Sequence, residues 1–173
     1  MSEKHSVQIF HFEDNGSIPN NPNLPVILYP GALIDKPEWC ESVFNGNGWR
    51  NSWENGVFNY HHYHSNTHEV LGVTHGSILI RLGGEDGKSF DLKAGDVIVL
   101  PAGTGHKRIT ASDDFRIVGA YPDGMDYNTR LENDGKHDAS IQEIAEVPLP
   151  RTDPVYGDKG PLLENWNKSM KHG

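Results

Sequence analysis

The stretch GVFNYHHYHSNTHEVLGVTHG, residues 56–76, decides the fold when it is taken together with GDVIVLPAGTGH, residues 95–106. The fixed positions of the first stretch read G-x5-H-x-H-x4-E-x6-G, and those of the second read G-x5-P-x-G-x2-H. Together they supply three imidazoles and one carboxylate: His62, His64, His106 and Glu69. Such a ligand set suits a catalytic transition metal.

The spacing of these residues predicts how they meet. His62 and His64 are two positions apart, so on a strand both side chains point to the same face. Glu69 follows a turn and begins the next strand, and His106 opens a strand much later in the chain. Four ligands from three strand ends converge only if the sheet curls over on itself, as it does in a jelly roll.

The region that contains both stretches has the pattern of a β-protein. Short runs rich in branched residues alternate with turns, of which the glycine-rich segment 83–87 is the clearest. The expected strands are residues 70–73, 77–82, 90–92, 97–100, 106–110 and 115–121. Several short strands at this spacing favour a sandwich or barrel over a parallel α/β sheet.

On these residues the two-block pattern resembles that of the cupin superfamily, over residues 52–125. The resemblance implies an all-β fold, a double-stranded β-helix or jelly-roll barrel with one or two short peripheral helices. The four ligands named above would then hold one divalent transition metal, either Fe, Mn, Ni, Co or Zn. The run PRTDPVYG, residues 150–157, is similar to that of small bacterial cupins with no assigned role.

We expect residues 1–173 to form one cupin domain, with segments on either side of the core barrel. Residues 1–51 should form an N-terminal arm with edge strands and a short helix. That helix is expected to begin at Asp35, which offers a capping side chain before an early proline, and to end near Gly46.

Residues 126–173 are expected to form a C-terminal extension of the same domain. Within it, Ser140 and Glu143 have the spacing of a capping box and predict the start of one short helix. Residues 147–173 contain four prolines and are expected to be an extended tail.

Two residues near the predicted ligands are candidate catalytic residues. Tyr60 precedes His62 by two positions, so it either offers a phenol to a bound ligand or fills the barrel interior. Arg108 follows His106 by two positions, so it either faces the cavity and pairs with an anionic substrate group or forms a salt bridge at the rim.

Three further histidines lie close to the predicted ligands in the sequence. By strand alternation, His61 faces away from His62 and is expected to pack or to contact the surface. His68 could replace Glu69 only if the turn between the strands shifted. His75 is expected to be a solvated turn residue.

Composition excludes several classes of protein. The net charge of −9 and the lack of a basic stripe argue against nucleic-acid binding. No segment approaches the roughly 20 apolar residues of a membrane helix, and the first residues lack the apolar centre of a signal peptide. The single cysteine, Cys40, fits a reducing compartment. We therefore expect a cytoplasmic protein with no membrane partner.

The ligand set favours a metal-dependent enzyme that acts on a small polar molecule. Four protein ligands on an octahedral ion leave two adjacent positions, which suits dioxygenase-type oxidoreductase chemistry. A metal-assisted isomerase or lyase is the first alternative, and a non-catalytic cupin that binds a sugar-like molecule is the second. The arm and the extension are suited to clasping a second barrel, so a closed two-fold homodimer is expected.

Overall fold

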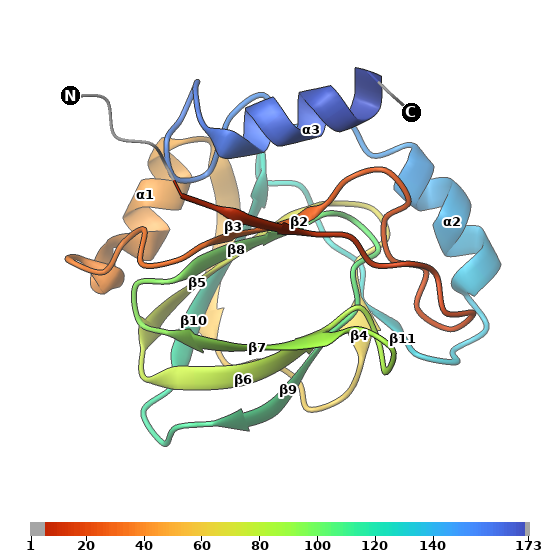
Figure 1. The fold of residues 1–173 in the computed structure, drawn as a ribbon, viewed down its shortest axis with the longest axis horizontal. Helices are drawn as coiled ribbons and strands as arrows, with labels where there is room; N and C mark the ends of the chain where they lie inside the picture. The colour runs from red at the N-terminus through yellow and green to blue at the C-terminus, as the bar shows by residue number, and fades with distance from the viewer. Residues whose placement is uncertain (1–5, 172–173) are drawn as a thin grey trace.

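The computed structural model describes residues 6–171, apart from the side chains of residues 168–171. Its strands form two antiparallel sheets that enclose a shared core (Figure 1). The first sheet has six strands in the order β1 (Gln8–Phe10), β2 (Val26–Tyr29), β8 (Val97–Leu100), β5 (Glu69–His75), β10 (Arg116–Pro122) and β3 (Trp49–Asn55). The second has five in the order β11 (Arg130–Leu131), β4 (His62–Tyr63), β9 (His106–Ala111), β6 (Ser77–Leu82) and β7 (Lys88–Lys93). The predicted all-β jelly roll is confirmed.

The five-stranded sheet has one face in the core and one toward solvent. Along β6 every second residue is buried, beginning with Ile78, and β7 buries Phe90 and Leu92. This alternation is typical of an antiparallel sheet that covers the core on one side only. The inner residues Ile80 and Leu82 pack against the other sheet in a shared hydrophobic cluster.

The central strands of the six-stranded sheet are buried on both faces. Every residue of β2 and β8 is buried, and along β5 His75 alone is exposed. One face contributes Leu71 and Ile98 to the core between the sheets. The other face packs against α1 (Cys40–Gly46) and α3 (Pro161–Lys171), through Phe44 and Trp166 among others (Figure 1). The continuous apolar runs in these strands reflect this double coverage.

The N-terminal segment joins the six-stranded sheet. β2 pairs with β8, and β1 pairs with β2 at the edge. After them, a single turn η1 (Pro37–Trp39) leads directly into α1, which ends at Gly46.

The predicted extended tail over residues 147–173 is wrong, because α3 occupies much of it. Pro161 stands at the first helical position, where its missing N–H has no consequence. Leu162 and Trp166 are four residues apart, so they lie on one helix face, and both are buried against the outer face of the six-stranded sheet. The Trp166 indole donates a hydrogen bond to the Pro25 carbonyl at 2.9 Å.

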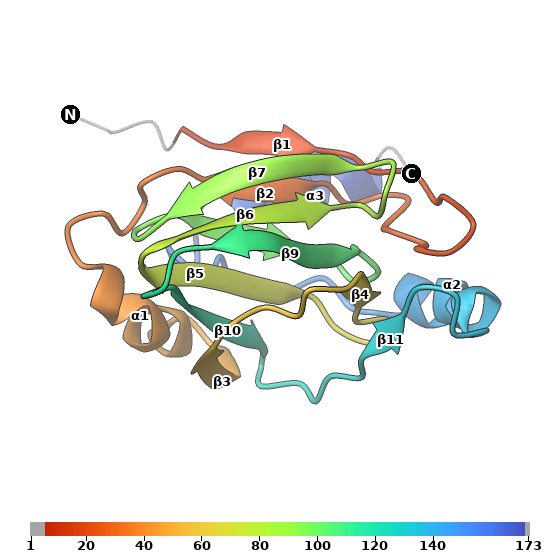
Figure 2. The same cartoon turned by 90° about the horizontal axis from the view of Figure 1, so that it is seen from below.

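The predicted capping box is also wrong. The helix α2 (His137–Ala145) begins three residues before Ser140, which therefore lies inside it. The Ser140 hydroxyl is fully buried and lies 3.0 Å from the Tyr63 hydroxyl, so the helix side chain contacts β4 rather than capping its own N-terminus. Figure 2 shows α2 beside β4 and β11 at one end of the barrel.

The run at residues 150–157 forms a turn that is centred on a buried carboxylate, Asp153. Its Oδ1 accepts hydrogen bonds from the backbone N–H groups of Val155 and Tyr156, at 2.8 and 3.1 Å. Its Oδ2 accepts from the Tyr29 hydroxyl at 2.8 Å and from the Leu162 N–H at 3.1 Å. The turn thereby connects β2 with the start of α3.

Among the described residues, no helix is long and apolar enough to cross a membrane.

Candidate metal centre

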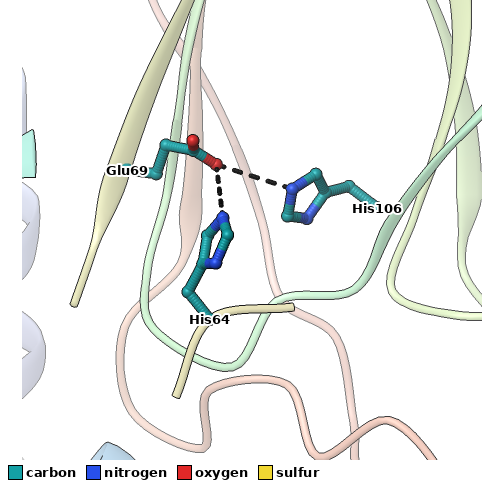
Figure 3. A group of neighbouring side chains, drawn as sticks. All are labelled: His64, Glu69 and His106. Atoms are coloured by element: carbon teal, nitrogen blue, oxygen red, sulfur yellow. Dashed lines mark ion pairs between the residues drawn. The ribbon is translucent and has the colours of Figure 1, made fainter. Parts of the chain in front are cut away.

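Three of the four predicted metal ligands meet inside the barrel. His64 follows β4, His106 begins β9 and Glu69 begins β5 in the opposite sheet. The Nε2 atoms of His64 and His106 lie 3.3 and 3.5 Å from the same carboxylate oxygen, Oε1 of Glu69. Figure 3 shows both rings directed at that oxygen. One potential ligand atom from each of the three residues lies within 4.8 Å of the others.

The fourth predicted ligand, His62, lies beside this group without being part of its tightest cluster. It is paired directly across from His106 in the β4–β9 ladder, and the two ring centroids are 4.0 Å apart. Its centroid is 6.1 Å from that of His64. His62 lines the same cavity as the other three ligands, so it faces the same space.

Backbone carbonyls orient all three imidazoles in the same way. The Nδ1 of His62 lies 3.1 Å from the Tyr60 carbonyl, and that of His106 lies 3.0 Å from the Thr104 carbonyl. The Nδ1 of His64 is bonded to the Asn128 carbonyl. A carbonyl only accepts, so each Nδ1 is the donor and each neutral ring keeps the Nε2 lone pair free. Histidines that bind metals are held in this manner.

The carboxylate of Glu69 is buried, with one oxygen bound and one without a hydrogen bond. Oε2 accepts a hydrogen bond from the Tyr121 hydroxyl at 2.8 Å, and the Trp53 indole donates to that hydroxyl at 2.8 Å. Oε1 accepts no hydrogen bond within the described structure. A buried charged oxygen without a partner is costly, and a cation at this point would satisfy it. The residues present therefore fit a divalent metal.

The environment shifts the pKa values of the three histidines differently. Burial lowers the pKa of His62 to about 4. Burial, together with the nearby His62 and His64, lowers the pKa of His106 well below its usual value. Burial acts in the same direction on His64, but the negative charge of the adjacent Glu69 outweighs it and raises the pKa of His64. The lowered pKa values favour the neutral forms of His62 and His106, which are the forms that bind a cation.

The four predicted ligands line a cavity of about 520 Å³. Its other walls are formed mainly by aromatic and apolar side chains, with a few polar groups. The remaining lining residues are Trp53, Glu54, Asn55, Gly56, Val57, Phe58, Leu71, Arg108, Tyr121, Tyr127 and Thr129. This volume is sufficient for a small organic molecule.

The two candidate catalytic residues take different positions. Arg108 lines the cavity, and its backbone N–H donates a hydrogen bond to the Phe58 carbonyl at 2.9 Å. Tyr60 lies outside the lining, with its ring stacked on Phe58 at 4.9 Å and with 44% of its surface exposed. A side chain that is this exposed does not fill the barrel interior.

Sequence reasoning missed two residues that shape the site. Tyr121 holds Glu69 from β10, and Asn128 holds His64 from the loop that follows β10. The side chain of Asn128 also binds the neighbouring turn, since its Oδ1 accepts from the Ser65 N–H at 2.9 Å and its Nδ2 donates to the Ser65 hydroxyl at 2.8 Å. Each of them contacts a residue that lies more than 50 positions away in the sequence, so no local pattern predicts these contacts.

The other histidines have separate roles. His61 is buried, and its Nε2 lies 2.6 Å from Oε1 of the exposed Glu85. His68 is buried, with Nδ1 accepting a hydrogen bond from the Ala102 N–H at 2.9 Å and Nε2 donating to the Pro148 carbonyl at 3.2 Å. Both nitrogens of His68 are therefore engaged, and it does not replace Glu69. His75 is exposed at the end of β5.

Comparisons with known proteins agree with this architecture. A cupin-domain family model matches residues 53–118. The uncharacterized protein YjlB of Bacillus subtilis is 43% identical over 161 residues, which cover 93% of this chain and 97% of that protein.

Similar solved structures include a DUF861 family protein from Thermotoga maritima and an acireductone dioxygenase from Bacillus anthracis with a cadmium ion in its active centre. The first is 23% identical over 49% of this chain and 88% of that chain, with a TM-score of 0.34. The second is 21% identical over 55% of this chain and 63% of that chain, with a TM-score of 0.37. From its two motifs, its fold and its match to the family model, this chain belongs to the cupin superfamily.

Proposed function

We propose that this protein is a metal-dependent enzyme that acts on a small polar molecule in the barrel cavity. The observation that carries the proposal is the buried Oε1 of Glu69, which accepts no hydrogen bond and faces the Nε2 atoms of His64 and His106. A site built only for stability would satisfy that oxygen with a neutral donor. Here the surrounding nitrogens are arranged as lone-pair donors, which suits a cation.

His62, His64, Glu69 and His106 would hold one divalent transition metal, either Fe, Mn, Ni, Co or Zn. The set of three nitrogens and one oxygen, without thiolate, differs from that of structural zinc sites. When bound, such an ion supplies Lewis acidity and, for a redox-active metal, the activation of dioxygen. We propose dioxygenase-type oxidoreductase chemistry, because four protein ligands leave two adjacent positions on an octahedral ion.

The protein itself would contribute orientation and exclusion of water. The carbonyls of Tyr60, Thr104 and Asn128 fix the imidazole rings, and Tyr121 fixes the carboxylate. Pre-oriented ligands keep the coordination geometry constant during a reaction. The aromatic walls of the cavity would remove water from a bound substrate and strengthen electrostatic contacts within it.

The first test is the metal content of protein purified without added metal, measured by elemental analysis. We expect close to one equivalent in the wild type and a loss of most of it in H106A and H62A. The matched control is H75A, because His75 is exposed and lies outside the cavity. Wild-type metal content in H106A and H62A would refute the proposed site.

The second test is turnover. The metal-loaded protein is mixed with pools of small polar metabolites, and dioxygen consumption is recorded with an oxygen electrode. Oxygen uptake that H106A lacks supports dioxygenase-type chemistry. Conversion of a pool component without oxygen uptake indicates an isomerase or lyase instead, and retention of a component without any conversion indicates a binding protein.

A further inference from the structure

We propose that the cavity takes a small carboxylate with an apolar body, and that Arg108 binds the carboxylate group. This inference rests on the proposed function, because it assigns the substrate class of the same cavity. Three observations support it: the position of Arg108, the balance of charge in the cavity and the composition of its walls.

Arg108 is directed into the cavity by strand geometry. It follows His106 by two positions on β9, and the two residues pair with Ile80 and Leu82 in a regular register. Residues two apart on a strand lie on one face, about 7 Å from each other. Both line the cavity, so Arg108 and the predicted metal ligands border the same space.

Arg108 has no counter-ion within the part of the chain that the structure describes. Its neighbour Lys107, on the opposite face of β9, lies 3.7 Å from Glu85. Besides Glu69, Glu54 is the other acidic residue in the cavity lining, but it lies 3.5 Å from Arg116 and accepts a hydrogen bond from Thr74 at 2.8 Å. A half-buried guanidinium that faces a cavity without an anion is suited to an anion that arrives with the ligand.

The balance of charge in the cavity points the same way. Three neutral imidazoles and the Glu69 carboxylate reduce the charge of a divalent ion from +2 to +1. The Arg108 guanidinium adds a second positive charge, whereas Glu54 is matched by Arg116. With a divalent metal bound, a cavity with this charge attracts an anionic ligand and disfavours a cationic one.

The walls indicate what the rest of the ligand is like. Phe58 and Tyr127 line the cavity with 51% and 42% of their surfaces exposed. Trp53, Val57 and Leu71 add to the apolar part of the lining. Large apolar side chains exposed in a concave site are typical of surfaces that a ligand covers. The occupant therefore combines a carboxylate, which Arg108 can bind through two parallel hydrogen bonds, with an apolar body.

The test uses benzoate and its neutral isostere benzamide as probes, with the full-length protein loaded with zinc, which is redox-inert. Binding is measured by isothermal titration calorimetry for the wild type, R108Q, R108K and K107Q. We expect R108Q to bind benzoate about 10- to 100-fold more weakly, the effect of losing one charge-assisted bidentate contact. R108K should lose less benzoate affinity than R108Q, because lysine keeps the positive charge although it lacks the planar guanidinium group that pairs with both carboxylate oxygens.

K107Q is the matched control, since it removes a neighbouring cation on the other face of the strand and should leave benzoate binding unchanged. Benzamide should bind the wild type more weakly than benzoate does. R108Q should bind the two probes with equal affinity. The inference is overturned if R108Q binds benzoate like the wild type, if benzamide binds the wild type as tightly as benzoate, or if no benzoate binding is detected at millimolar concentration.

Zinc content, measured on the same samples, separates this inference from the proposed function. If R108Q retains wild-type zinc and wild-type benzoate affinity, the assignment of the substrate class alone fails. If the wild type takes up no zinc, the proposed function fails, and the comparison of benzoate binding between the wild type and R108Q in metal-free protein still decides the role of Arg108.

Discussion

The turn around Asp153 and the cavity around Glu69 each bury a carboxylate, but they differ in how its charge is satisfied. The two oxygens of Asp153 accept four hydrogen bonds, from Tyr29, Leu162 and the backbone of the turn itself. Glu69 has one oxygen bound to Tyr121 and the other without a hydrogen bond. Their exposed fractions are almost equal, 0% and 2%.

Burial alone therefore does not distinguish a carboxylate whose hydrogen bonds are all made from one that keeps a free acceptor. The number of neutral donors around it does, because a fully bonded carboxylate has no capacity left for a ligand. Asp153 connects β2 with α3 and stabilises the fold, whereas Glu69 retains an acceptor that faces two imidazole nitrogens. Substitutions at and around the two carboxylates should therefore have different consequences.

The largest effect is expected for D153A. Removal of this carboxylate leaves several buried donors without an acceptor, at a cost of about 1–3 kcal/mol each before relaxation. We expect the free energy of unfolding to fall by about 4 kcal/mol and Tm to fall by about 10 °C. Urea and thermal denaturation measure both. D158A changes an exposed acid five residues later and should stay within about 0.5 kcal/mol of the wild type; equal effects of the two variants would remove the structural role of Asp153.

E69Q, in contrast, should weaken metal binding strongly and change the stability of the fold only slightly. The amide keeps an acceptor for Tyr121, so the unfolding free energy of the metal-free protein should change by less than about 1 kcal/mol. Metal affinity should fall by more than about 100-fold, because loss of a coordinating carboxylate should weaken binding more than loss of a residue that only orients a ligand. Elemental analysis and the rise in Tm on adding zinc measure this. A large loss of stability in metal-free E69Q, with metal uptake intact, would make Glu69 a structural carboxylate like Asp153.

Y121F sharpens the contrast by removing only the neutral donor to Glu69. The carboxylate stays in place but loses its orienting hydrogen bond, so metal affinity should fall by about 10-fold. Competition with a chromogenic chelator measures the affinity. Y127F is the control, because Tyr127 stacks on Tyr121 at 4.5 Å and lines the same cavity, while no hydrogen bond to Glu69 is made by its hydroxyl within the described residues. A similar loss in both variants would show that ring packing, not the hydroxyl, matters.

The smallest effect is expected for H137Q, which removes a pairing with an exposed carboxylate: His137 Nε2 lies 2.7 Å from Asp14. Hydrogen bonds to Asp138 and Asp14 raise the pKa of His137. A raised folded-state pKa stabilises the protein below the unfolded value and loses that effect as the pH rises through the folded value. H137Q should therefore be less stable than the wild type by under about 1 kcal/mol below pH 6, and the difference should vanish at higher pH. Chemical denaturation from pH 5 to 9 measures it; a gap that grows with pH would be inconsistent with this pairing.

The proposed metal ligands could be picked out from the sequence because their spacing is a local property. His62 and His64 share a face through strand alternation, and Glu69 and His106 each stand where a strand begins. The strands themselves followed from runs of branched residues between turns, and β6 and β8 match the expected ranges to the residue.

The errors came from segments whose structure depends on distant partners. The four prolines between residues 147 and 173 predicted an extended tail, yet α3 forms where Leu162 and Trp166 find an apolar surface on the six-stranded sheet. Ser140 matched a capping pattern, but Tyr63 and Arg130 bind its hydroxyl inside α2. Tertiary contacts of this kind routinely override local preference.

By itself, the sequence determined the β-rich architecture and indicated the residues proposed to bind a metal, because strand periodicity and motif spacing depend on neighbours in the chain. The tertiary structure alone decided which oxygen of Glu69 is left without a hydrogen bond, and that Tyr121 and Asn128 orient the site. It also decided that Arg108 faces the cavity without a counter-ion among the described residues. Those facts depend on which donors and charges two closing sheets bring together, and no local pattern encodes that.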